Sequence, residues 1–255
     1  MAAMDEARRN FLVRAASLLA MATAAGLAAA VPAAGRRPAA LDRLFVRVNE
    51  ECRDLKVGAL SAPAWQDALA DLFRNVPPED LARFIDLDGT AAAMALPDRG
   101  VETRIVSLPR IDFGGEVQHF RKVFGMRRGR AIIPHGHRNM VSCHFVLRGS
   151  CRLRQYDVVD RSDPSEWIIS PAVDRVAAPG DLSSIFDERH NVHWLIAREE
   201  PTWLFDVIVL DVGTLPGKAY EVFNLDPDAG RFGPDGLAVP VIPVDEGLAR
   251  YGAAS

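Results

Sequence analysis

Nine short apolar segments follow one another between Thr103 and Val212, and no helical pattern separates them. Residue pairs that favour turns, such as Arg148-Gly149 and Pro179-Gly180, lie between several of the segments. Successive strands joined by short turns pair antiparallel, so this region is expected to form an antiparallel sandwich or barrel. The predicted strands lie in TRIVSL, VQHFRKVFGM, RAIIPHGH, VSCHFVLRG, SCRLRQYDVV, EWIISPAV, DLSSIFD, NVHWLIA and TWLFDVIVLDV.

The segments before this region have the periodicity of helices. Apolar residues recur at helical spacing in LDRLFVRVNEECRDL, SAPAWQDALADLFRNV and PPEDLARFIDL, and Ser61 is placed to cap the second of them. Each helix has one apolar face that must be covered. We therefore expect a helical N-terminal layer over 41–96 that packs on a β-barrel over 101–222. The tail, 223–255, is rich in Gly, Pro and Asp, which predicts an irregular C-terminal wrap.

The first 34 residues have the pattern of an export signal. Arg8 and Arg9 precede Phe11 and Leu12, an Ala- and Leu-rich run follows, and PAAG offers small residues for cleavage. The pattern resembles a twin-arginine signal, which implies export machinery as a partner and a periplasmic or secreted protein. A plain secretory signal or an uncleaved membrane anchor remains the alternative. The run is short for a span that needs about 20 strongly apolar residues, so no stable membrane insertion is expected after cleavage.

Charge and cysteine content narrow the possible partners and bonds. The 255-residue chain has a formal net charge of −4 and no basic stripe, so nucleic acid is not expected as a partner. Three cysteines are an odd number and predict no disulfide framework. Cys143 and Cys151 lie in the strand-rich region and are expected to be small core residues. Whether they pair in an oxidising compartment stays open.

All six histidines lie between His119 and His193. His135 and His137 are two residues apart, and a strand with that spacing places both imidazoles on one face. A third metal ligand could come from RHNVHWLIA, where strand alternation allows only one of His190 and His193 to face the same way. The alternative is that these are ordinary polar strand residues. Imidazoles suit zinc, copper, iron and nickel, so spacing does not identify a metal.

The histidines belong to a wider pattern that resembles the two motifs of the cupin superfamily. The resemblance implies a mainly β fold, a cupin (double-stranded β-helix or jelly-roll) barrel, with a metal on three of the histidines. Many metal cupins carry a glutamate where this chain has Ser142. Without that carboxylate, three neutral imidazoles leave the charge of a divalent ion uncompensated, which favours an anion such as a thiolate. The matching residues are Gly129, His135, His137, Gly149, Pro179, Gly180 and His193.

A narrower resemblance covers roughly 41–215. IIPHGHRNMVSCHFVLRGSCRLRQYD is similar to the core of the thiol dioxygenase family that includes plant cysteine oxidases and cysteamine (2-aminoethanethiol) dioxygenase, and RHNVHWL is similar to that family's GGNIHCF. His193 matches the third ligand, whereas His190 falls where the family has glycine. The resemblance implies Fe(II) on His135, His137 and His193, dioxygen as co-substrate, and a small thiol (cysteamine, cysteine or an N-terminal cysteine) that is oxidised to a sulfinate.

Three further residues are expected near that site. Tyr156 and Asp206 are carried over from the resemblance as pocket residues, and Asp206 could orient a ligand histidine through its ring N–H. His144 faces the same way as Ser142 by alternation, so it is expected either to contact substrate beside the metal or to be a buried structural histidine. Two other functions remain open: a metal-dependent cupin oxygenase for a non-thiol, and a non-catalytic periplasmic cupin in which His144 or His190 completes the metal shell.

Overall fold

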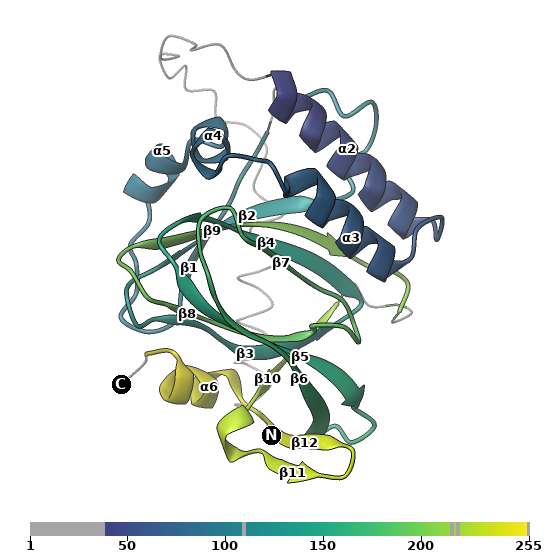
Figure 1. The fold of residues 1–255 in the computed structure, drawn as a ribbon, viewed down its shortest axis with the longest axis vertical. Helices are drawn as coiled ribbons and strands as arrows, with labels where there is room; N and C mark the ends of the chain where they lie inside the picture. The colour runs from purple at the N-terminus through teal and green to yellow at the C-terminus, as the bar shows by residue number, and fades with distance from the viewer. Residues whose placement is uncertain (1–38, 109–110, 215–216, 218–219, 254–255) are drawn as a thin grey trace. The chain divides into compact units, whose positions relative to one another are not determined.

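The computed structural model describes residues 39–108, 111–214, 217 and 220–253. The predicted export signal, 1–34, lies outside the described residues. Helices come first along the chain, as predicted, and strands follow (Figure 1). Among the described helices, none is both long and apolar enough to cross a membrane. In the described residues, four helices precede the strands: α2 (Ala39–Lys56), α3 (Ala62–Phe73), α4 (Pro78–Phe84) and α5 (Leu87–Ala92).

Twelve strands in the described residues form two sheets. One sheet has the order β1-β2-β9-β4-β7 and the other has the order β10-β3-β8-β5-β6-β12-β11. Each of the nine predicted strand segments overlaps one of the observed strands. The strands are β1 (Glu102–Ile105), β2 (Phe120–Met126), β3 (Ala131–Arg138), β4 (Met140–Arg148), β5 (Cys151–Asp160), β6 (Glu166–Ala177), β7 (Leu182–Ile185), β8 (Val192–Ala197), β9 (Thr202–Leu210), β10 (Glu221–Leu225), β11 (Arg231–Gly233) and β12 (Gly236–Ile242).

The pairing of the strands is nested around the turn between β5 and β6. β5 pairs with β6, β4 with β7, β3 with β8 and β2 with β9, all antiparallel. The chain therefore forms one long double-stranded ribbon, and the additional pairs β4–β9 and β5–β8 wind this ribbon into a barrel. This is a double-stranded β-helix, the cupin barrel, and it confirms the fold expected from the sequence.

The helical layer packs on the outer face of the sheet that contains β4 and β9. Phe145 and Phe205 point from these strands into the same core cluster as the helices, which include Phe45 of α2 and Phe73 of α3. The Phe45 ring lies 5.8 Å from the Phe205 ring in an edge-to-face arrangement. Ser61 caps α3 by accepting a hydrogen bond from the Ala64 amide. The predicted cover of the barrel by N-terminal helices is therefore present (Figure 1).

The prediction of an irregular C-terminal wrap is wrong. β10 pairs with β3, β12 pairs with β6, and α6 (Val244–Tyr251) follows. Leu237 and Val239 of β12 are buried with Trp167 of β6 in one apolar cluster. The period-two pattern of GLAVPVI is present in the sequence, but the surrounding Gly, Pro and Asp residues obscured it. The strands of the tail therefore extend the second sheet at both edges and pair with each other through β10 and β12.

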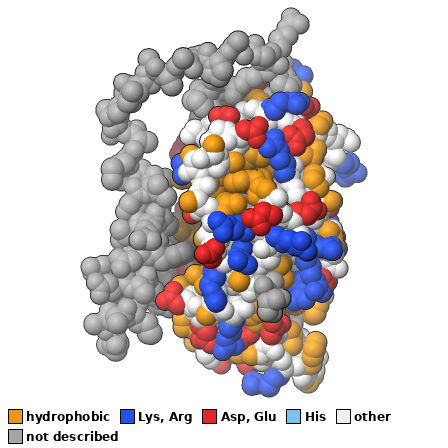
Figure 2. Space-filling model, turned by 90° about the vertical axis from the view of Figure 1, so that its left-hand side faces the viewer, with side chains coloured by type: hydrophobic (Ala, Val, Ile, Leu, Met, Phe, Trp, Pro, Cys, Tyr) orange, Lys and Arg blue, Asp and Glu red, His pale blue; other side chains and the backbone are white. Residues whose placement is uncertain are grey.

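The three cysteines are buried core residues. Cys52, Cys143 and Cys151 are free thiols and all are buried; burial raises the pKa of each thiol and makes it unreactive. Figure 2 shows acidic and basic side chains interspersed around an apolar patch on one face of the protein. That nucleic acid is not a partner stays a prediction.

Candidate metal centre

Three histidines from two adjacent strands meet inside the barrel. His135 and His137 lie on β3, and His193 lies opposite His135 on β8 in the strand register. One ring nitrogen of each residue lies within 4.8 Å of the others. A metal ion about 2 Å from each imidazole nitrogen requires nitrogens within about 4 Å of one another, so the group is close to ligating geometry. The three predicted ligands are brought together, and His190 is not among them.

Backbone carbonyls fix the orientation of two of these rings. The Nδ1 atom of His135 lies 2.7 Å from the carbonyl oxygen of Ile133, and Nδ1 of His193 lies 2.8 Å from that of Asn191. A carbonyl only accepts, so both Nδ1 atoms carry the hydrogen and the lone pairs are on Nε2. The Nδ1 atom of His137 is buried and has no protein partner among the described residues.

All three imidazoles are held in the neutral form that binds metals. Burial lowers the pKa of His135 to about 4. Burial, reinforced by the neighbouring imidazoles, lowers the pKa of His137 and of His193 well below the usual value. Neutral rings with free lone pairs fit a divalent transition metal, and no carboxylate belongs to the group among the described residues.

A network of hydrogen bonds holds the backbone of His137. The side-chain oxygen of Asn191 accepts from the His137 amide at 2.6 Å, and its nitrogen donates to the His137 carbonyl at 2.8 Å. The same nitrogen donates to the carbonyl of Asp187 at 2.6 Å. Arg161, in the turn after β5, donates to the Asp187 carboxylate and to the His137 carbonyl. Asn191 lies in RHNVHWL, the segment that is similar to the family's GGNIHCF, whereas no local motif gave a signal for Asp187 and Arg161.

Replacing Asn191 with alanine is expected to lower metal affinity by about 10- to 100-fold, because the His137 backbone loses both of its clamping bonds. Metal competition titrations of the two proteins would measure this difference. Ser165→Ala, in the exposed turn before β6, is the control and should leave the affinity unchanged. An Asn191→Ala protein with native affinity would show that the clamp does not position the ligand.

A second polar row faces the histidines from the other sheet. In the strand register Lys122 of β2 lies beside Asp206 of β9, Asp206 beside His144 of β4, and His144 beside Ser183 of β7. The His144 ring lies 5.3 Å from the His193 ring, so the two rows meet across the barrel. The prediction that His144 points inward beside the metal group agrees with this geometry.

Asp206 pairs with His144 rather than with a ligand histidine. Its Oδ2 atom lies 3.5 Å from His144 Nε2, and the two side chains are 2% and 5% exposed. Burial raises the pKa of Asp206 well above its usual value, against the lowering effects of Lys122 and a Ser142 hydrogen bond. Burial lowers the pKa of His144 to about 3. The expectation that Asp206 orients a ligand histidine is thus corrected: its carboxylate contacts His144, because the two residues are register partners on adjacent strands.

Tyr156 does not join the site. The pairing of β5 with β6 shifts register between Gln155 and Tyr156. Gln155 is buried opposite His193, whereas Tyr156 packs with Trp167 and Val192 in the cluster that the C-terminal strands cover. The carry-over of Tyr156 as a pocket residue is therefore wrong, because its side chain lies on the other face of the sheet. Gln155, one residue earlier, takes the inward position.

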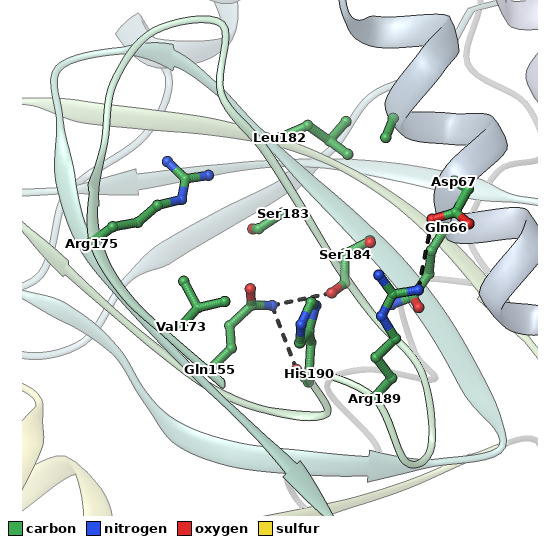
Figure 3. A pocket seen from close by; sticks show the side chains of 11 residues that line it. Gln66, Asp67, Gln155, Val173, Arg175, Leu182, Ser183, Ser184, Arg189 and His190 are labelled. Atoms are coloured by element: carbon green, nitrogen blue, oxygen red, sulfur yellow. Dashed lines mark hydrogen bonds and ion pairs between the residues drawn. The ribbon is translucent and has the colours of Figure 1, made fainter. Parts of the chain in front are cut away.

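A cavity of about 190 Å³ lies between α3 and the strands β5 to β7. Two of its lining residues share a strand register with histidines inside the barrel. Gln155 is the register partner of His193, and Ser183 is the register partner of His144. Figure 3 shows Gln155 reaching toward Ser184 and His190. His190 lines this cavity and does not belong to the three-histidine group.

Comparisons with known proteins agree with the fold and do not extend it. No protein-family model and no curated protein matches the sequence. Solved structures similar to the chain include KdgF from Halomonas sp. (17% identity, TM-score 0.30, covering 43% of this chain and 78% of that one). They also include a cupin superfamily protein from Desulfitobacterium hafniense (10% identity, TM-score 0.32, 48% and 87%) and the pumpkin pro-11S globulin (15% identity, TM-score 0.35, 52% and 30%). The fold of this chain rests on the strand pairing described above.

Proposed function

We propose that this protein is an iron-dependent oxygenase that oxidises a small thiol to a sulfinate with dioxygen. The observation that carries the proposal is a buried group of three neutral histidines with no carboxylate among them. Such a group leaves the full charge of a divalent ion available to an anionic ligand, and a thiolate is a soft anion of this kind. His135, His137 and His193 would hold Fe(II), which supplies redox chemistry and open positions for thiolate and dioxygen.

Apolar side chains pack on both sides of the histidines and limit the access of water to them. On one side Val146 and Leu204 pack with Leu195 in one cluster, and on the other side Met140 packs with Ile208 in a second. Water is therefore kept from the reacting groups once substrate is bound. The cavity lined by Gln155 and Ser183, the register partners of His193 and His144, would give substrate a route toward the histidines.

His144 and Asp206 are suited to handle a proton. They form a buried pair, and the ring of His144 contacts the ring of His193. A thiol that binds as a thiolate must lose its proton, and the Asp206 carboxyl, with its raised pKa, can hold a proton inside the barrel. His144 orients that carboxyl and lies between it and the metal group.

The test is metal analysis of protein purified without added metal, followed by oxygen uptake with iron-loaded protein. Cysteamine, cysteine, 3-mercaptopropionate and a peptide with N-terminal cysteine are the trial thiols. Uptake that depends on thiol, with a sulfinate product detected by mass spectrometry, supports the proposal. Full iron loading without uptake on any thiol would overturn it. Uptake that appears only with non-thiol compounds would favour the alternative of a different cupin oxygenase.

Filling the cavity is expected to block access without disturbing the metal. Ala70 lines the cavity from the exposed side of α3, so Ala70→Trp should lower kcat/KM at least about 10-fold through misplacement or exclusion of substrate. Metal content and Tm should stay at the native values. Asp71→Trp, an exposed substitution on the same helix that does not line the cavity, is the control. Equal kcat/KM for Ala70→Trp and native protein would place the entrance elsewhere.

A further inference from the structure

Lys122 places a positive charge in the layer of the barrel that holds the metal group. Its register partner is Asp206, so its side chain starts on the inward face of β2. The residue is partly buried, and burial lowers the pKa of its ammonium group. The Lys122 ammonium lies 5.5 Å from the centre of the Phe120 ring, a weakly stabilising contact.

Lys122 forms no ion pair in the described part of the chain. Among the described residues, the inward carboxylate beside it in the strand register is Asp206, whose Oδ2 atom lies 3.5 Å from His144 Nε2. No carboxylate oxygen among the described residues lies within 4.0 Å of the Lys122 nitrogen, whereas most of the described arginines have such a partner. Partly buried lysines are usually paired or fully extended to solvent.

Lys122 belongs to the polar row that meets the metal group across the barrel. The row runs from Lys122 through Asp206 to His144, whose ring lies 5.3 Å from that of His193. An ammonium group and a divalent ion in the same low-dielectric space repel each other. An anion between them removes this repulsion and gains a charge-assisted hydrogen bond from the ammonium.

We propose that Lys122 binds a carboxylate of the substrate, so that the substrate is a thiol acid rather than a simple aminothiol. This inference rests on the proposed function, because it assigns the second functional group of the thiol that the metal would hold. The thiolate would take an open metal position, and the carboxylate would lie against Lys122 on the β2 side of the barrel. Among the trial thiols this favours 3-mercaptopropionate and cysteine over cysteamine, whose ammonium group Lys122 repels.

The test compares two ligands of the same length in equilibrium binding. 3-Mercaptopropionate carries a thiol and a carboxylate, and 3-mercapto-1-propanol carries a thiol and a neutral hydroxyl. Calorimetry without oxygen, on protein loaded with Fe(II) or Zn(II), should show the acid binding at least about 10-fold more tightly than the alcohol. In Lys122→Met the two ligands should bind within about twofold of each other, and Lys122→Arg should retain most of the preference.

Lys56→Met, which removes an exposed lysine at the end of α2, is the matched control and should keep the native ratio. Circular dichroism and metal content of Lys122→Met verify that it folds and loads metal. An unchanged ratio in a folded, metal-loaded Lys122→Met protein overturns the inference, as does equal binding of the two ligands by the native protein. Lys122-dependent binding of the acid without oxygen uptake would refute the oxygenase function alone, whereas uptake of thiols with no dependence on Lys122 would refute only the role of Lys122.

Discussion

His193→Ala is expected to lower affinity for a divalent transition metal by more than about 100-fold, beyond the loss seen when a residue that only supports a ligand is removed. His193 is 1% exposed and lies at the centre of the site, with ring contacts to His135, His137 and His144. Removing it leaves two nitrogens on one strand, which cannot enclose an ion from a second side. Metal content after dialysis and competition titration with a chromophoric chelator would measure the loss.

His190→Ala is the matched control for this change. His190 lies three residues earlier in the same segment, but it lines the outer cavity and has a positive φ of 57°. Its replacement should leave metal content at the native level. Equal metal loss in the two variants would mean that the segment, rather than the His193 imidazole, is required.

The His144→Ala variant tests whether His144 is a metal ligand or only a neighbour of the metal group. If His144 only accompanies the site, the variant should keep metal and lose oxygen uptake, because the Asp206 carboxyl then lacks its partner. A His144→Ala protein that loses metal as completely as His137→Ala would instead indicate a closed shell. That result would favour a non-catalytic metal-binding cupin.

Phe45→Ala is expected to destabilise the protein by about 3–5 kcal/mol, the usual cost of emptying a large buried aromatic site. Phe45 is fully buried and contacts aromatic rings from α3, α4 and β9: its ring centre lies 6.5 Å from Phe73, 5.6 Å from Phe84 and 5.8 Å from Phe205. One substitution therefore loosens the helices from each other and from the barrel. Urea unfolding at equilibrium would measure the change in the free energy of unfolding.

Arg43→Ala, on the exposed face of the same helix, should change the free energy of unfolding by less than about 0.5 kcal/mol. A cost below about 1 kcal/mol for Phe45→Ala would mean that the helical layer is not part of the cooperative core. A full cost shows that the barrel needs its N-terminal cover.

Local patterns were enough to predict the β-barrel and the ligand pair on β3. Period-two alternation marks strands because successive side chains point to opposite faces, and the same rule places His135 and His137 together. The C-terminal strands were missed because β12 lies among Gly, Pro and Asp residues, and because its burial depends on Trp167, some 70 positions earlier in the chain.

The sequence by itself determined the order of strands, the cover of helices and the three histidines as candidate ligands, because each depends on neighbours a few residues away. Only the tertiary structure decided which residues face those histidines. Tyr156 lies outside the site, and Gln155 takes the inward position. Asp206 pairs with His144, and Lys122 has no carboxylate partner among the described residues. These positions depend on register between distant strands, and a shift of one residue sends a side chain to the opposite face.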